Sequence, residues 1–319
     1  MRLLAVQFAI SIALVLLALA AVEAYLRLTI PGSSRESIYE YTLSTKRYKV
    51  KKPNATVVAW GKELRTNELG FRDATPRLAP KRPGEFRIVV LGDSFTVSAG
   101  VDFSRIYTTL LEQRLKEKHP GARVINLAVG GYNVVQYAAV LEEVALGLDP
   151  DMVVVALYPE NDFSMDTYEE NFRIASGDTA AADVPWVQSL YTYRAYLGKV
   201  VNRFGRKEAP KADTSKGWDE NIGALRAIAR TTEEHGLPLA VIALPSTWAL
   251  GSQRPVFQRV EAECARLPNA RCFMLLEPLI ASGIDEASLR LNALDAHPNE
   301  RYNAFVAEAL APFIGGLLN

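Results

Sequence analysis

The chain alternates between short apolar runs and longer stretches in which apolar residues recur every three or four positions. Apolar runs that are rich in β-branched residues and almost free of polar ones are typical of strands buried on both faces of a parallel sheet. Five runs have this character and are predicted to be strands: 86–91, 123–129, 152–157, 239–244 and 271–276.

The stretches between these runs predict amphipathic helices. Leu111 and Leu115, for example, share one face of a helix expected over about 104–118. Strands that alternate with helices imply parallel β-α-β units with right-handed crossovers. The predicted fold is a three-layer α/β/α sandwich with about five parallel strands in a flavodoxin-like order. The other helices are expected around 140–148, over 218–235 and 256–266, and from residue 300 onward.

Two segments lack this alternation. Residues 31–85 are polar and interrupted by prolines, so we expect a tether followed by a short hairpin, with the clearest turn signal at 66–73. Residues 163–214 carry many aromatic side chains and are expected to form an insertion over the carboxyl edge of the sheet, where it would shape a substrate cleft. The alternative is a small subdomain whose aromatic side chains pack on one another. The main domain is expected to span 86–319.

Residues 1–30 form the most apolar segment. No charged residue lies between Leu3 and Val22, and a helix of this length covers about 30 Å, the hydrocarbon thickness of a bilayer. The segment is either an uncleaved signal anchor or a signal peptide cleaved near Val22-Glu23-Ala24. Its length exceeds the range usual for the apolar part of a signal peptide, which favours the anchor. Arginines on both sides leave its orientation undecided.

Composition adds two constraints. Lys and Arg together number 36, as do Asp and Glu, and this zero net charge gives no support for a nucleic-acid partner. The two cysteines, Cys264 and Cys272, flank a predicted helix-to-strand loop, which fits either a disulfide in an oxidising compartment or two unpaired thiols. A zinc site is not supported, because no histidine lies near them.

The first predicted strand of the sheet ends at Gly92-Asp93-Ser94. Open α/β sheets bind ligands at the carboxyl ends of their strands, so Ser94 is a candidate nucleophile. A serine nucleophile needs a general base, which is normally a histidine oriented by a third group.

The chain has three histidines. His119 and His235 each end a predicted helix, where a cation is favoured, so both have a structural explanation. His297 lies instead in a polar loop, two residues after Asp295. The predicted catalytic triad is therefore Ser94, His297 and Asp295.

Ester cleavage also needs donors for the oxyanion of the tetrahedral intermediate. The second and third predicted strands are followed by Gly131 and Asn161. A glycine can bring its backbone amide close to a ligand, and an asparagine offers its side-chain amide. Together with the amide of Ser94, these two residues are the predicted oxyanion hole.

These blocks, in this order, resemble those of the SGNH (or GDSL) hydrolase family. The matching segments are 92–94, 126–131, 161–162 and 295–299, and the resemblance covers about 86–162 and 237–315. It implies serine esterase or acyl-transfer chemistry with no metal and no dissociable cofactor. Two positions depart from the family pattern. Glu160 stands where glycine is common, and the usual Asp-x-x-His spacing would place Leu294 at the aspartate position, so Asp295 must orient the imidazole from one residue nearer.

The sequence therefore predicts a serine hydrolase that cleaves carboxylic esters on an extracytoplasmic glycan or lipid. Its catalytic domain would be held at the membrane by the N-terminal helix, or secreted if that segment is cleaved. One alternative is an O-acetyltransferase acting on an exopolysaccharide, and another is a membrane-tethered binding module without turnover. The expected partners are an ester-bearing small molecule, glycan or lipid and the membrane, and the oligomeric state is not indicated.

Overall fold

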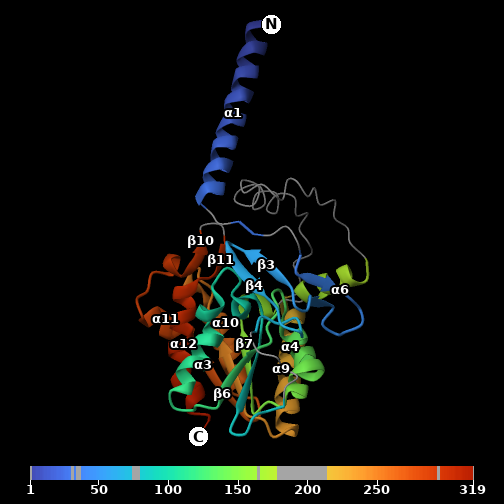
Figure 1. Cartoon of the computed structure of the whole chain (residues 1–319). Coiled ribbons are helices and arrows are strands. Elements are labelled where there is room, and N and C mark those ends of the chain that lie inside the picture. The colour runs from blue at the N-terminus through green and yellow to red at the C-terminus, as the bar shows by residue number, and fades with distance from the viewer. Residues whose placement is uncertain are drawn as a thin grey trace. The chain divides into compact units, whose positions relative to one another are not determined.

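A computed structural model describes residues 2–29, 32–33, 37–73, 80–163, 166–177, 214–292 and 295–318. The chain divides into two units, of which the larger comprises Ser34–Thr179 and Ala212–Asn319 and contains the sheet (Figure 1). The smaller unit comprises Met1–Ser33 and Ala180–Lys211.

The larger unit is built on a five-stranded parallel sheet in the order β6-β5-β7-β8-β9. All five predicted strands are present. The second ends at Asn126, three residues earlier than expected, where the Asn126 side chain accepts a hydrogen bond from the Ala128 amide at 3.0 Å. The amides of Leu127 and Val129 still donate to carbonyls of the neighbouring strand. The strands are β5 (Phe86–Gly92), β6 (Ala122–Asn126), β7 (Met152–Leu157), β8 (Leu239–Ala243) and β9 (Ala270–Met274).

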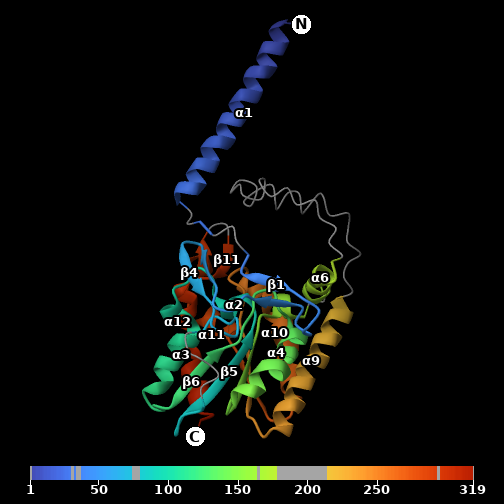
Figure 2. The ribbon, with the colours of Figure 1, turned by 45° about the vertical axis from the view of Figure 1, so that its right-hand side comes forward.

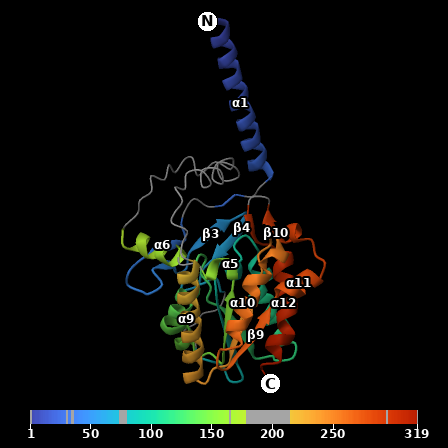
Figure 3. The same cartoon turned by 180° about the vertical axis from the view of Figure 1, so that it is seen from behind.

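Helices cover both faces of this sheet, which confirms the predicted three-layer α/β/α fold. On one face α3 (Tyr107–Lys116) packs against α12 (Glu300–Gly315), as Figure 2 shows. On the other face α9 (Thr214–Glu234) lies between α4 (Val134–Val140) and α10 (Arg254–Cys264), a row seen from behind in Figure 3. The strand order and right-handed crossovers place the helices in this way.

Shorter elements connect these layers. The helix expected around 140–148 begins earlier, because Asn133 and Gln136 form a capping box in front of α4, and it continues through a π-turn and a 3-10 turn to Leu148. The remaining elements after β5 are α2 (Ser94–Val97), α5 (Pro159–Asp162), α6 (Asp166–Ala175), α11 (Leu276–Ala281), β10 (Arg290–Asn292), β11 (Asp295–Pro298) and 3-10 turns at Phe103–Arg105, Leu250–Gln253 and Glu286–Leu289.

The segment expected to be a tether is folded over residues 37–73. It forms two antiparallel pairs, β1 (Tyr39–Tyr41) with β2 (Lys49–Lys51) and β3 (Thr56–Ala59) with β4 (Lys62–Arg65). The hairpin turn is Trp60-Gly61, not the stretch 66–73, because both residues adopt the positive φ that two-residue hairpin turns require.

The turn signal at 66–73 belongs to a separate loop after β4. The Asn67 side chain closes that loop by accepting hydrogen bonds from the amides of Leu69 and Phe71, each at 3.0 Å. Phe71 and Arg72, at the end of the loop, are both buried. The loop therefore packs into the larger unit instead of linking it to the N-terminus.

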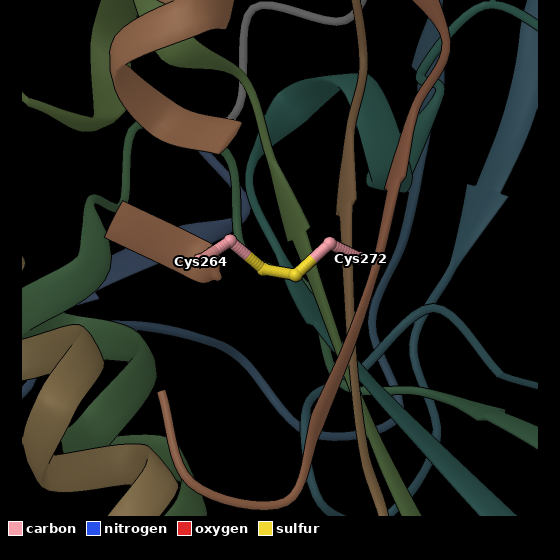
Figure 4. The surroundings of a disulfide bond; sticks show 2 residues. All are labelled: Cys264 and Cys272. Carbon is pink, nitrogen blue, oxygen red and sulfur yellow. A yellow bond between two sulfur atoms is a disulfide. The ribbon is translucent and has the colours of Figure 1, made fainter. Parts of the chain in front are cut away.

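Cys264 and Cys272 form a disulfide (Figure 4). The bond joins the last residue of α10 to the edge strand β9. Of the two arrangements that the sequence left open, the structure has the cross-linked one.

The smaller unit contains α1 (Arg2–Thr29). Its Leu4–Thr29 portion has a mean hydropathy of 2.6 and is long and apolar enough to cross a membrane. A signal sequence at the N-terminus meets the same criteria, so length and composition fit both interpretations. Of the expected insertion at 163–214, α6 is described, and residues 178–213 lie outside the described part of the chain.

Candidate active site

Ser94 lies at the carboxyl end of β5, as the first residue of the short helix α2. Asp93 caps this helix, and its carboxylate accepts a hydrogen bond from the Phe95 amide at 2.9 Å. Gly92 is required before it, since a Cβ at this position would lie 2.5 Å from Thr96 Oγ1. The motif around Ser94 therefore builds the tight strand-to-helix turn that presents the hydroxyl.

Arg72 holds the other end of α2. Its guanidinium is buried and donates to the carbonyl oxygens of Val97 at 2.8 Å, Ser98 at 2.7 Å and Val101 at 2.6 Å. The Val97 and Ser98 carbonyls lie at the carboxyl end of α2, where carbonyls lack partners within the helix. Arg72 comes from the segment expected to be a tether, and no local pattern marks it as part of the site.

The structure brings the three predicted triad residues into one hydrogen-bonded chain. His297 Nε2 lies 2.9 Å from Ser94 Oγ, and His297 Nδ1 lies 2.5 Å from Asp295 Oδ1. The same carboxylate oxygen accepts the backbone N–H of His297 at 2.9 Å.

The short Asp-x-His spacing fits this geometry. Asp295 and His297 both lie on β11, where residues two apart point to the same face of the strand. The Asp295 carboxylate can therefore reach the His297 imidazole with only one residue between them in the chain. Leu294, which occupies the position of the family's usual aspartate, lies outside the described residues.

The charges of the site are coupled. Burial by itself would lower the pKa of His297, but the hydrogen bond and charge of Asp295 outweigh it, and the pKa is raised above the usual value. Burial by itself would raise the pKa of Asp295. Its hydrogen bonds and the charge of His297 outweigh burial and lower the pKa, so this carboxyl remains ionised. The pair is thus arranged to stabilise an imidazolium.

Trp60 also supports the aspartate. Its side chain donates a hydrogen bond to the Asp295 carboxylate, which helps to lower the pKa of that group. Trp60 lies in the turn between β3 and β4, more than two hundred residues away in the chain. Only tertiary packing reveals this contact.

Two more carboxyl groups, those of Asp93 and Asp162, are buried close to Ser94. Burial raises the pKa of Asp93 to about 6. Asp162 accepts hydrogen bonds from Tyr137 Oη at 2.8 Å and the Tyr158 amide at 2.6 Å, and burial together with the charge of Asp93 raises its pKa well above the usual value. The charge of Asp93 also raises the pKa of His297, so Asp93 favours a positive imidazole next to Ser94.

The predicted oxyanion-hole residues lie close to this chain. A Cβ on Gly130 would lie 3.6 Å from Ser94 Cβ, so the loop after β6 passes directly against Ser94. Gly131 follows with φ +75°, a conformation that favours glycine. Asn161 joins the same loop, as its Nδ2 donates to the Tyr132 carbonyl at 2.9 Å and, over a longer 3.5 Å, to Asp162 Oδ1.

The carboxylate of Glu160 does not block this region. Glu160 is exposed and accepts a hydrogen bond from Tyr158 Oη at 2.8 Å. The Tyr158 ring in turn stacks on Phe95, next to the nucleophile, with ring centroids 3.9 Å apart. In the described part of the chain, no three His, Cys, Asp or Glu side chains gather as a metal site requires.

Solved structures with a similar fold include esterases and acylhydrolases. The structure of TesA is 17% identical and covers 72% of this chain and 99% of its own, with a TM-score of 0.46. The acetyl xylan esterase AlAXEase is 16% identical over 72% of this chain and 100% of its own, with a TM-score of 0.46. A GDSL-like lipase from Bacteroides thetaiotaomicron is 15% identical over 75% and 93%, with a TM-score of 0.45.

The family model of the GDSL-like lipases and acylhydrolases matches residues 90–305, about two thirds of the chain and the part that carries all five site residues. No curated protein matches the sequence. The chain belongs to the GDSL-like lipase/acylhydrolase family and is an ester-hydrolysing enzyme.

Proposed function

We propose that this protein is a serine esterase in which Ser94 is the nucleophile, His297 the general base and Asp295 the group that orients the imidazole. The observation that carries the proposal is the continuous hydrogen-bonded chain from Ser94 Oγ through both ring nitrogens of His297 to Asp295 Oδ1. This chain has the connectivity that serine nucleophiles use in unrelated hydrolases.

In the first half of the reaction, His297 Nε2 takes the proton of Ser94 Oγ while that oxygen attacks the ester carbonyl carbon. The carbonyl oxygen becomes an oxyanion, held by the amides of Ser94 and Gly131 and by the Asn161 side chain. The intermediate then collapses, His297 returns the proton to the leaving alcohol, and the acyl group remains on Ser94. Water repeats the sequence to release the acid.

The three oxyanion donors are not equivalent. The Ser94 amide also lies within hydrogen-bonding reach of the Asp93 carboxylate. Besides the Tyr132 carbonyl, Asn161 Nδ2 has only a long contact of 3.5 Å to Asp162 Oδ1, which an oxyanion could replace. The orientation of Asn161 is set further by Thr167 Oγ1, which donates to Asn161 Oδ1 at 3.3 Å. Asn161 is therefore the donor whose removal tests the oxyanion hole with least disturbance of the nucleophile.

Replacing Asn161 by alanine is expected to lower kcat about 10²- to 10³-fold with little change in KM, the scale for loss of one oxyanion donor. Asn161→Asp, which keeps the shape but adds a negative charge, should lose at least as much. Steady-state kinetics on p-nitrophenyl acetate measures both, with thermal unfolding as the control for folding. An unchanged kcat in Asn161→Ala would remove this residue from the oxyanion hole.

We further infer that residues 1–30 tether an extracytoplasmic catalytic domain that spans 86–319. The apolar helix α1 and the Cys264–Cys272 disulfide support this location, because disulfides persist in oxidising compartments. A glycan or lipid ester outside the cytoplasm is the proposed substrate class. An acyl-chain-length series on model esters, with acetylated xylan included, tests the substrate.

The nucleophile is tested by fluorophosphonate labelling of the full chain. An activated serine attacks the phosphorus and displaces fluoride, so Ser94 should carry the label, as peptide mass spectrometry would show. Labelling should be lost in His297→Ala, because the hydroxyl then lacks its base. Efficient labelling at another serine, or none at all in a folded protein that hydrolyses esters, would contradict the proposal.

A further inference from the structure

The N-terminal segment of the larger unit places a lysine ammonium directly against the proposed oxyanion hole. Strand β2 and the residues just before it are attached to the loop after β6 and to the start of α4 by three hydrogen bonds. Gln136 Nε2 donates to the Arg47 carbonyl at 2.7 Å, Tyr132 Oη donates to the Lys49 carbonyl, and Lys51 Nζ donates to the Ala128 carbonyl at 2.7 Å. Lys49 is therefore held in place by the same loop that carries Gly131.

The Lys49 side chain ends at Gly131. A Cβ on Gly131 would lie only 2.7 Å from Lys49 Nζ, so the ammonium fills the space where any other residue would carry a side chain. Lys49 is 9% exposed, and its Nζ lies 4.7 Å from the centroid of the Tyr39 ring. Tyr39 itself reaches the neighbouring glycine, since a Cβ on Gly130 would lie 2.7 Å from Tyr39 Oη.

Among the residues that the structure describes, no carboxylate forms a salt bridge with Lys49, and Glu170 acts on it only through a longer-range charge interaction. Its neighbour Lys51 differs, because Lys51 Nζ donates to a backbone carbonyl. A largely buried ammonium is costly unless an anion pairs with it, so the missing partner points to a negative charge that is present only when substrate is bound.

We propose that Lys49 stabilises the negative charge that develops on the substrate's carbonyl oxygen, as a charged addition to the oxyanion hole. The inference rests on the proposed function, which places that oxygen at the amide of Gly131. The ammonium is preorganised by Tyr39 and by the β2 contacts, and therefore needs little rearrangement during the reaction. Its charge is worth more at this site than in water, because the surroundings are largely buried.

The proposal predicts a distinct pH dependence. Burial lowers the pKa of Lys49 to about 8, while the charge of Glu170 raises it. The ammonium is present below that pKa and is lost above it, so kcat should fall as pH rises through about 8. The titratable groups that face Lys49 are Tyr39 and Tyr41 from β1, Lys51 from β2, Tyr132 from the β6–α4 loop and Glu170 from α6.

The test compares Lys49→Met, Lys49→Arg and Lys52→Met in the full chain, using p-nitrophenyl acetate between pH 5.5 and pH 10. Methionine keeps the apolar stem without the charge, arginine keeps the charge, and Lys52 is an exposed lysine of the same segment. Lys49→Met is expected to lower kcat about tenfold to a hundredfold, less than loss of a direct oxyanion donor, and to abolish the alkaline limb. Lys49→Arg should retain a larger share of kcat and move the limb to higher pH, and Lys52→Met should match the wild type.

Two results would overturn the inference. One is a wild-type kcat and alkaline limb in a folded Lys49→Met protein. The other is a loss confined to KM on esters that carry a carboxylate, which would make Lys49 a binding group for anionic substrates. If Lys49→Met does not fold, the pH profiles of the wild type and of Lys49→Arg still test the inference. An alkaline limb of kcat that stays at the same pH in Lys49→Arg would also exclude Lys49 from stabilising the oxyanion. Failure of the proposed function is separate, since it would appear as activity in Ser94→Ala.

Discussion

Replacing Ser94 by alanine is expected to lower kcat/KM by about three to six orders of magnitude, the range seen when a nucleophile that acts with its base as a unit is removed. His297 Nε2, 2.9 Å from Ser94 Oγ, then has no hydroxyl to deprotonate. The residual rate would come from the oxyanion hole and from binding alone. The measurement is hydrolysis of p-nitrophenyl acetate, with enzyme concentrations high enough to detect the residual rate.

The fold should survive this change. Ser94 Oγ makes its contacts with Asp93 and His297 at the edge of the sheet, whereas α2 is held by the Asp93 cap and by Arg72. Thermal unfolding should therefore stay close to that of the wild type. Ser104→Ala, a change at an exposed serine ten residues away, is the matched control and should keep full activity. Substantial turnover in Ser94→Ala would exclude Ser94 as the nucleophile.

Replacing Asp295 by asparagine is expected to lower kcat about 10³- to 10⁴-fold, because an amide does not hold the imidazole in the correct tautomer or stabilise its charge. The acidic limb of the pH profile should also move. The active form has a neutral His297, so activity is present above its pKa and is lost as pH falls through it. Since Asp295 raises that pKa above the usual value, the wild-type limb should lie above about pH 6.5, and that of Asp295→Asn should lie lower.

A pH series of kcat/KM between pH 4.5 and pH 8 measures both effects. Asp219→Asn, at an exposed carboxylate on α9, is the control for a change of net charge and should leave the limb in place. The double variant Ser94→Ala/Asp295→Asn should be no slower than Ser94→Ala, because the three residues act together. An acidic limb that stays in place in Asp295→Asn would mean that another carboxylate sets the pKa of His297.

The segment 37–73 changes the picture that the sequence suggests. Its polar, proline-interrupted pattern predicts a tether and a short hairpin. In the structure the segment also supplies three side chains around the candidate site. Arg72 holds the end of α2, Trp60 supports Asp295, and Lys49 lies against Gly131. Short strands and irregular loops carry no long hydrophobic period, so local pattern gives no warning of such contacts.

The amino-acid sequence by itself determined the layered fold and the order of the site residues. Long apolar runs marked β5 to β9, because a strand buried on both faces needs apolar residues throughout. Ser94, Gly131 and Asn161 could be placed near one another since the carboxyl ends of parallel strands meet at one edge of a sheet. His297 followed from the scarcity of histidines, and Asp295 from its position two residues earlier.

The tertiary structure decided what depends on contacts between distant segments. It paired Cys264 with Cys272, moved the hairpin turn to Trp60-Gly61, and put Asp295 and His297 on one face of β11. It also gave the site the buried titratable groups of Asp93, Asp162 and Lys49, whose pKa values depend on burial and neighbours and not on residue type alone. Sequence periodicity reports which face of an element is buried, whereas the partners of a buried charge are set only when the elements pack together.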